Sequence, residues 1–181
     1  MKKLLMILHL ALILCFMVGC QNKEAMAELE EFKAQVEVEE QNKELIRNYL
    51  EELDKGNAEI LREVYAPDAA YYFPSGIAEL MTVEQEIEQV KMFHAGIPDL
   101  VHEIEEIMAT GDKIIVRFVA RGTHTGDLGM GIPPTGNKVE VSSIVIFRIE
   151  NGRVVEERQD ADMLGFMQQL GMELKPKEAE K

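Results

Sequence analysis

The fold of this chain is decided by the stretch Gly152-Arg-Val-Val-Glu-Glu-Arg-Gln-Asp-Ala-Asp-Met-Leu-Gly-Phe-Met-Gln-Gln-Leu-Gly171. Asn151 precedes it, and an Asn-Gly pair is typical of a tight hairpin turn, so the stretch begins as a β-strand. It ends as a short helix, with Asp162 at the junction. If no bulge intervenes, alternate side chains fall on two faces: Val154, Glu156, Arg158, Asp160 and Asp162 on one, and Val155, Glu157, Gln159 and Ala161 on the other. Neither face is wholly apolar, so one of them faces water or a polar cavity.

Three further strands are predicted before this stretch. The hydrophobic period is two over residues 101–108, 113–121 and 139–149. In the first of these strands, one side is expected to carry His102, Ile104, Glu106 and Met108.

The strand over residues 139–149 is apolar on both faces, with Ile144 and Ile146 opposite Val145 and Phe147. One face can line a cavity while the other meets a second subunit. This pattern predicts a possible homodimer.

The first half of the domain is predicted to be mostly helical. Apolar residues at helical spacing indicate helices over 42–55, 57–64 and 82–93, and Thr82 with Gln85 forms a capping box at the start of the third. A brief aromatic strand is predicted over residues 70–73. Helices followed by consecutive antiparallel strands are typical of an α+β domain with helices on one face of a curved sheet. Such a sheet encloses a cone-shaped hollow in which a pocket forms.

Residues 1–19 are predicted to be a lipoprotein signal peptide. Lys2 and Lys3 precede an apolar run that is shorter than the ~20 residues needed to span a membrane. The ending Met17-Val-Gly-Cys20 resembles a bacterial lipobox, which implies that Cys20 becomes the lipidated N-terminus. The alternative is an ordinary secretory signal with an incidental cysteine. The lipid predicts an extracytoplasmic lipoprotein of the cell membrane or outer membrane.

The chain is strongly acidic, with a formal net charge of -14. Removal of Lys2 and Lys3 with the signal makes this -16 (-14 minus 2). Such a chain repels phosphate backbones, so no nucleic-acid partner is expected. Only Cys20 would remain as a cysteine, so no internal disulfide is expected.

The chain is predicted to hold one folded domain over residues 42–172. Residues 20–41 are rich in Glu, Lys, Ala and Gln, which indicates a lipidated tether that is partly helical, either a solvated spacer or a docked helix. Residues 173–181 are charged and are predicted to be a disordered tail.

Four segments occur along the chain in this order: Phe93-His-Ala-Gly-Ile-Pro-Asp-Leu100, Arg121-Gly-Thr-His-Thr-Gly126, Pro133-Pro-Thr-Gly-Asn-Lys-Val139, and the terminal stretch with its Gln168-Gln-Leu-Gly171 ending. Together they resemble the motifs of SnoaL-like polyketide cyclases and their ester-cyclase relatives. The resemblance spans residues 42–172 and implies the curved-sheet cone of nuclear transport factor 2-like proteins. It also implies a small-molecule ligand and chemistry without metal or cofactor. In characterised cyclases of this family, an Asp on the last strand is the acid/base of an intramolecular aldol closure, and Asp162 matches that position.

The chain departs from the family pattern at Arg158, where the family commonly has Trp. A guanidinium there is expected to make the hollow polar and to favour ionised carboxylates nearby. The resemblance therefore leaves open whether a flat aromatic polyketide is the ligand.

Asp162 is the candidate catalytic residue, although an Asp at that place is also explained as a helix N-cap alone. The candidate substrate-binding residues are His124, Arg158, Asp160 and His102. Asp160 is alternatively a cap or a partner of Arg158, His124 a surface histidine bonded to the loop backbone, and His102 an ordinary half-buried histidine.

The three histidines outside the signal have no metal-ligand spacing, and there is no phosphate-binding loop, so no metal and no cofactor are expected. Two functions fit. One is a membrane-anchored module that binds a small apolar or amphipathic molecule, and the other is a cofactor-free cyclase, isomerase or lyase of a small carbonyl compound that uses Asp162.

Overall fold

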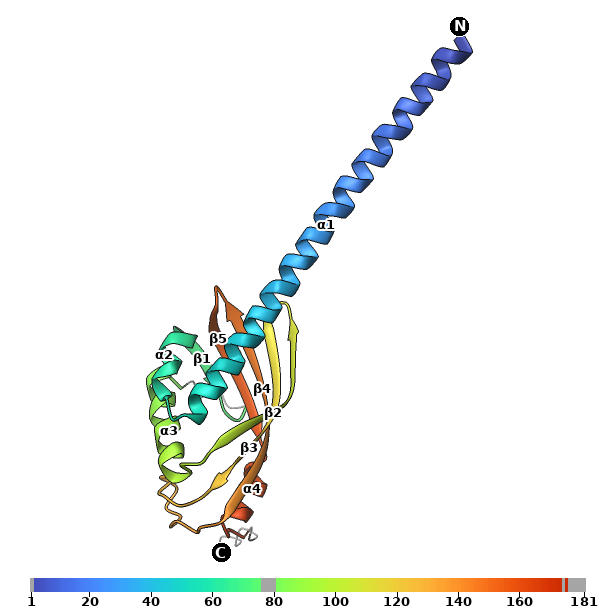
Figure 1. Cartoon of the computed structure of the whole chain (residues 1–181). Helices are drawn as coiled ribbons and strands as arrows, with labels where there is room; N and C mark the ends of the chain where they lie inside the picture. Colours follow the sequence, from blue (N-terminus) through green and yellow to red (C-terminus); the bar gives the residue numbers. More distant parts are fainter. Residues whose placement is uncertain (1, 76–80, 174, 176–181) are drawn as a thin grey trace, which may run out of the picture. The chain divides into compact units, whose positions relative to one another are not determined.

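The computed structural model describes the backbone of residues 2–75, 81–173 and 175, with side chains from residue 23 onward (Figure 1). It comprises two compact units, Met1–Val38 and Glu39–Lys181. Helix α1 (Lys2–Asp54) supplies the first unit and continues into the second. Within the first unit, side chains 23–38 are all exposed. The predicted lipidation site, Cys20, has its side chain outside the described part. Of the described helices, none has an apolar stretch long enough to cross a membrane.

The second unit contains the predicted helices. After the end of α1 come a 3-10 turn (Ala58–Ile60), α2 (Leu61–Val64), α3 (Val83–Gly96) and, near the C-terminus, α4 (Met163–Gln169). The capping box of α3 is confirmed. Thr82 Oγ1 accepts a hydrogen bond from the Gln85 amide at 3.3 Å, and Gln85 Oε1 accepts one from the Thr82 amide at 2.9 Å.

The sheet has five strands in the order β1-β5-β4-β3-β2. Their bounds are β1 Tyr65–Tyr72, β2 Val101–Thr110, β3 Lys113–Thr123, β4 Lys138–Glu150 and β5 Arg153–Ala161. Strands β2 to β5 pair antiparallel with their neighbours, whereas β1 runs parallel to β5, so the sheet is mixed. Figure 1 shows α2 and α3 on one side of this sheet. The α+β class with helices over a sheet is thus confirmed, and β1 is longer than the predicted strand over 70–73.

The β4–β5 hairpin turns at Asn151 and Gly152, which have φ values of 52° and 74°. Both residues of a type I′ turn need positive φ, which Asn and Gly adopt most readily. The hairpin predicted from this pair is therefore present.

Two β-bulges change which side chains face inward. In β4–β5 the pairing passes from Arg148↔Glu156 to Ile149↔Val154, leaving Val155 unpaired. As a result Val154 and Glu157, at 0% and 4% exposed, both lie on the buried face. The grouping of Val154 with Glu156 was expected only without a bulge, and it does not hold here, because a bulge adds one residue to one strand.

The second bulge lies in β2, where the register with β3 shifts between Ile104 and Glu106. Beyond this point Ile107 packs against the core, while Met108 is 46% exposed. The expected face of His102, Ile104, Glu106 and Met108 is therefore wrong in its second half.

The main core lies between the sheet and the helices. Tyr49 of α1 packs edge-on against Tyr65 of β1 and Phe147 of β4, with ring centroids 5.5 and 6.2 Å apart. A second cluster joins the loop of residues 124–137 to α4 and comprises Ile97, Leu128, Ile132, Val139, Phe166 and Leu170. The helix ends and strands that surround the site are thus held by packed apolar side chains.

Candidate functional site

A cavity of about 180 Å³ lies between the sheet and helices α1 and α3. Its wall is largely apolar and aromatic, with the rings of Phe73, Phe93, Phe118 and Phe147 among the lining side chains. No Lys or Arg belongs to the wall as far as the structure describes it. Ligand sites typically combine such an apolar wall with a few convergent polar groups.

Two buried carboxyl groups lie in this wall. Glu157 of β5 accepts a hydrogen bond from the Tyr65 hydroxyl, while the Oε2 of Glu86 on α3 is buried without a partner among the described residues. Burial raises the pKa of Glu157 to about 8, and the nearby charge of Glu86 adds to this effect. Burial alone raises the pKa of Glu86 to about 7. Near neutral pH these carboxyls therefore exchange protons readily, unlike exposed glutamates.

A row of neutral polar side chains crosses the same wall. The Tyr71 hydroxyl donates to Gln159 Oε1 at 3.1 Å, and Gln159 Nε2 donates to Ser143 Oγ at 2.9 Å. Ser143 Oγ in turn donates to the Asp160 carbonyl at 3.0 Å. The row fixes the amide of Gln159 and leaves it a second N–H with which to contact a ligand.

A histidine and a carboxylate are paired at another part of the wall. His102 Nδ1 lies 2.6 Å from Asp54 Oδ1, and the same carboxylate accepts the His102 backbone N–H at 3.1 Å. Asp54 thereby holds the proton on Nδ1 and leaves Nε2 as the basic nitrogen of this lining residue. His94 of α3 also lines the cavity, and its Nδ1 is buried without a partner in the described part of the chain.

Of the predicted site residues, only His102 lines the cavity. Asp162 is exposed and caps α4, its Oδ1 accepting the Gly165 N–H at 2.8 Å. Asp160 is exposed and accepts hydrogen bonds from Ser75. The catalytic role of Asp162 and the binding role of Asp160 stay predictions, and these positions do not support them.

Arg158 and His124 also lie outside the cavity wall. Arg158 contacts Glu156 at 2.7 Å and stacks over the Tyr72 ring at 4.0 Å, so its guanidinium does not make the hollow polar as expected. His124 is fully buried, with Nδ1 3.1 Å from the Thr135 hydroxyl. Its Nδ1 also lies 3.3 Å from the Thr135 backbone N–H, so the expected bond to the loop backbone is present, but the expected position at the surface is wrong.

Sequence reasoning missed the cavity residues Glu86, Glu157 and Gln159, and it missed Asp54, the partner of the lining residue His102. Glu86 carries a signal, because helical spacing places it on the same face of α3 as Val90 and Phe93, which also line the cavity. Alternation does place Glu157 and Gln159 on one face of their strand, but it does not show that this face is the buried one. Asp54 carries no signal, since its contact with His102 is distant in sequence. In the described residues, no three His, Cys, Asp or Glu side chains are grouped as a metal site.

Comparison with known proteins identifies the family. Residues 43–170 match the family model of SnoaL-like polyketide cyclases. The chain belongs to the SnoaL-like polyketide cyclase family. No curated protein sequence matches it.

Solved structures of SnoaL-like proteins share the fold. IdmH, a candidate polyketide cyclase from Streptomyces antibioticus, is 33% identical, with 72% of this chain and 99% of IdmH covered and a TM-score of 0.62. A SnoaL-like protein from Jannaschia sp. CCS1 is 27% identical, with 75% and 95% covered and a TM-score of 0.66. These similarities cover the SnoaL-like domain and agree with the cone fold of the family.

Proposed function

We propose that this SnoaL-like domain binds a small, largely apolar molecule in its cone cavity, outside the cytoplasm and tethered to a membrane by lipid on Cys20. The observation that carries the binding proposal is an apolar cavity of about 180 Å³ into which several polar groups converge. The resemblance of residues 17–20 to a lipobox supports the anchor.

A fluorescent apolar probe tests the binding proposal. N-phenylnaphthylamine, which is neutral, is expected to bind the full chain saturably and gain fluorescence. Ala161→Phe places a ring in the cavity wall and should abolish this gain. The control is Ser142→Phe on the opposite, exposed face of the sheet, which should retain it. Equal binding by both variants would contradict the proposal.

The second candidate is a cofactor-free cyclase or isomerase of a small carbonyl compound. The His102–Asp54 pair favours this second function, because Nε2 of His102 can take a proton from a carbon atom next to a carbonyl group. A carboxyl of raised pKa, such as Glu157, can return a proton to the substrate. In this version the cavity residues, and not Asp162, perform the transfer.

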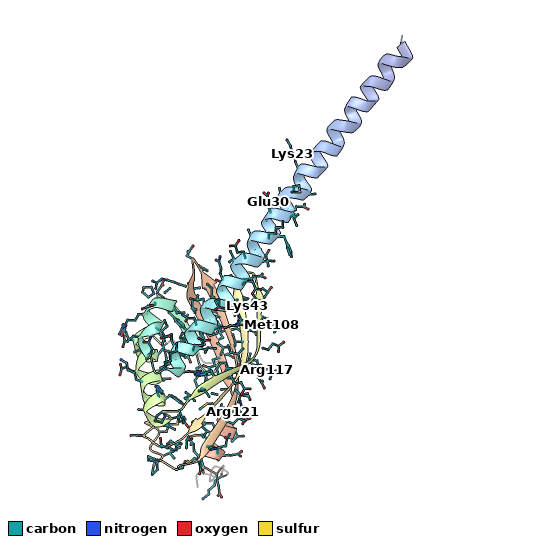
Figure 2. The ribbon with its side chains drawn as sticks, viewed as in Figure 1. Lys23, Glu30, Lys43, Met108, Arg117 and Arg121 are labelled. Carbon is teal, nitrogen blue, oxygen red and sulfur yellow. The ribbon has the colours of Figure 1, made fainter. Side chains whose placement is uncertain are left out.

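We also propose that the domain forms a homodimer through the outer face of the sheet. Ile144 and Ile146 of β4 are 49% and 38% exposed there, while Val145 and Phe147 are buried on the cavity side. Arg117 and Arg121 of β3, shown in Figure 2, are paired with glutamates on the neighbouring strands, so the face combines apolar residues with neutralised charges.

A further inference from the structure

The Glu86 carboxyl has no cationic or hydrogen-bonding partner in the described part of the chain. Glu86 is 9% exposed, lines the cavity, and its Oε2 is buried and unbonded. Glu157, 4% exposed, faces the same cavity, with the Tyr65 hydroxyl as its hydrogen-bond donor. The described cavity wall has two carboxyls and no Lys or Arg.

Buried carboxyls without partners are costly. Glutamate is rarely buried unless it is paired, and an unsatisfied buried acceptor loses the hydration it had in water. Glu86 is such a group, and Glu157 has the neutral Tyr65 hydroxyl as its one donor, so this apolar cavity holds two carboxyls with, among the described residues, a single hydrogen-bond donor between them. We take this to indicate that the ligand supplies the missing donors. A protonated amine does this well, since it brings several N–H donors and a positive charge.

We propose that the ligand is an apolar molecule with a basic amine, whose ammonium group binds at the part of the cavity lined by Glu86 and Glu157. The inference rests on the proposed function, because it names the chemical class of the molecule that the cavity binds.

The surroundings of the two carboxyls agree with a cationic group. Tyr49 and Tyr71 line the same wall, and aromatic rings attract cations through their faces. Burial raises the pKa of the Tyr49, Tyr65 and Tyr71 hydroxyls, which therefore stay neutral. The net charge of -14 attracts cations and repels anions over the whole protein.

The protonation of the carboxyls gives the binding a second signature. Burial raises the pKa values of Glu86 and Glu157 to near neutrality, so without ligand they hold protons for part of the time. An ammonium group beside them favours the ionised form. Binding of an amine near neutral pH is therefore expected to release protons to the buffer, whereas binding of a neutral molecule is not.

Three probes of one shape separate the possibilities. Naphthylethylamine, naphthylethanol and naphthylacetic acid share an apolar body and differ in the terminal group. Calorimetry on the full chain in detergent, near neutral pH, should show the amine binding about 10- to 100-fold tighter than the alcohol, with the acid weakest. Repeating the amine titration in two buffers of different ionisation enthalpy should show proton release.

Two variants and a matched control localise the effect. Glu86→Gln and Glu157→Gln should each weaken the amine about tenfold and so reduce its preference over the alcohol by about the same factor. Glu88→Gln removes the same charge from an exposed site on α3, with its side chain 75% exposed, and should alter neither. Melting temperatures report whether each variant folds, and the wild-type probe series decides the proposal even if one does not.

The outcomes distinguish this inference from the proposed function. If the alcohol binds as tightly as the amine or more tightly, the amine inference is wrong while the binding function stands. If none of the three probes binds, both are wrong. Amine binding that survives both glutamate substitutions unchanged also overturns the inference.

Discussion

The Tyr65 hydroxyl on β1 donates a hydrogen bond to the carboxyl of Glu157 on β5, across 92 positions of sequence. Both side chains are buried, at 3% and 4% exposed. The bond joins the parallel strand β1 to the strand that carries Glu157 and Gln159 of the cavity wall. It also keeps one carboxyl oxygen satisfied while the group remains in an apolar wall.

The first prediction concerns the pH dependence of stability. The pKa of Glu157 is about 8 in the folded chain and about 4.3 when unfolded, so the folded state binds more protons between these values. The contribution of the Glu157 carboxyl to the free energy of unfolding is fully present below about pH 4.3 and is lost as the pH rises toward 8. Glu157→Gln should reduce this loss by a few kcal/mol, on the order expected for such a pKa shift. Urea unfolding of both proteins at several pH values measures it, and parallel curves would contradict the prediction.

The second prediction separates a helix cap from a catalyst at Asp162. Because Asn caps about as well as Asp, Asp162→Asn should leave the free energy of unfolding nearly unchanged, whereas Asp162→Ala should lose ~1 kcal/mol. Neither should alter probe binding, since Asp162 caps α4 and is exposed. A turnover loss in Asp162→Asn with an unchanged melting temperature would restore its predicted catalytic role.

The third prediction tests proton transfer by the His102–Asp54 pair. Nitrobenzisoxazole reports on a base in an apolar site: the base removes a proton from carbon, the N–O bond breaks, and a coloured phenolate leaves. If the second candidate function holds, His102→Gln should slow this elimination by about 10²–10⁴-fold. Asp54→Asn should also slow it, with partial rescue by Asp54→Glu.

The control for this experiment is Asp162→Asn, which should keep the wild-type rate. An unchanged elimination rate in His102→Gln would show that His102 is not the base, contrary to the enzyme hypothesis. A slower rate that simply tracks a lowered melting temperature would assign the pair to structure, because Asp54 also accepts the His102 backbone N–H.

The fourth prediction concerns assembly. Ile144→Arg places a charge on the exposed face of β4 and should convert a dimer of residues 39–181 to a monomer at micromolar concentration, as measured by light scattering. Glu88→Arg introduces the same residue at an exposed site on α3 and should leave the dimer intact. A wild-type domain that is monomeric throughout would show that this face has no partner subunit.

The fifth prediction concerns the anchor. Cys20→Ser should leave the precursor unprocessed by the lipoprotein signal peptidase and abolish labelling with a fatty-acid analogue. Mature protein without lipid, cleaved at another bond, would instead support an ordinary secretory signal.

The sequence by itself determined the order and kind of the elements. Asn151-Gly152 specified the hairpin because both residues adopt positive φ, and Thr82 with Gln85 specified the start of α3 because their side chains bond the free amides there. The cap at Asp162 was equally local. Each of these signals acts between residues close in sequence, so the sequence alone is sufficient to predict these turns and helix starts.

Only the tertiary structure decided which side chains meet in the cavity. The bulge at Val155 turns Glu157, Gln159 and Ala161 to the same side as Val154, and no local pattern specifies it, because a bulge depends on the pairing of two strands. The contact of Asp54 with His102 spans 48 positions and forms only when the end of α1 packs beside β2. Alternation along one strand groups Glu157, Gln159 and Ala161, but strand register and helix packing decide that this group faces the cavity and what it meets there.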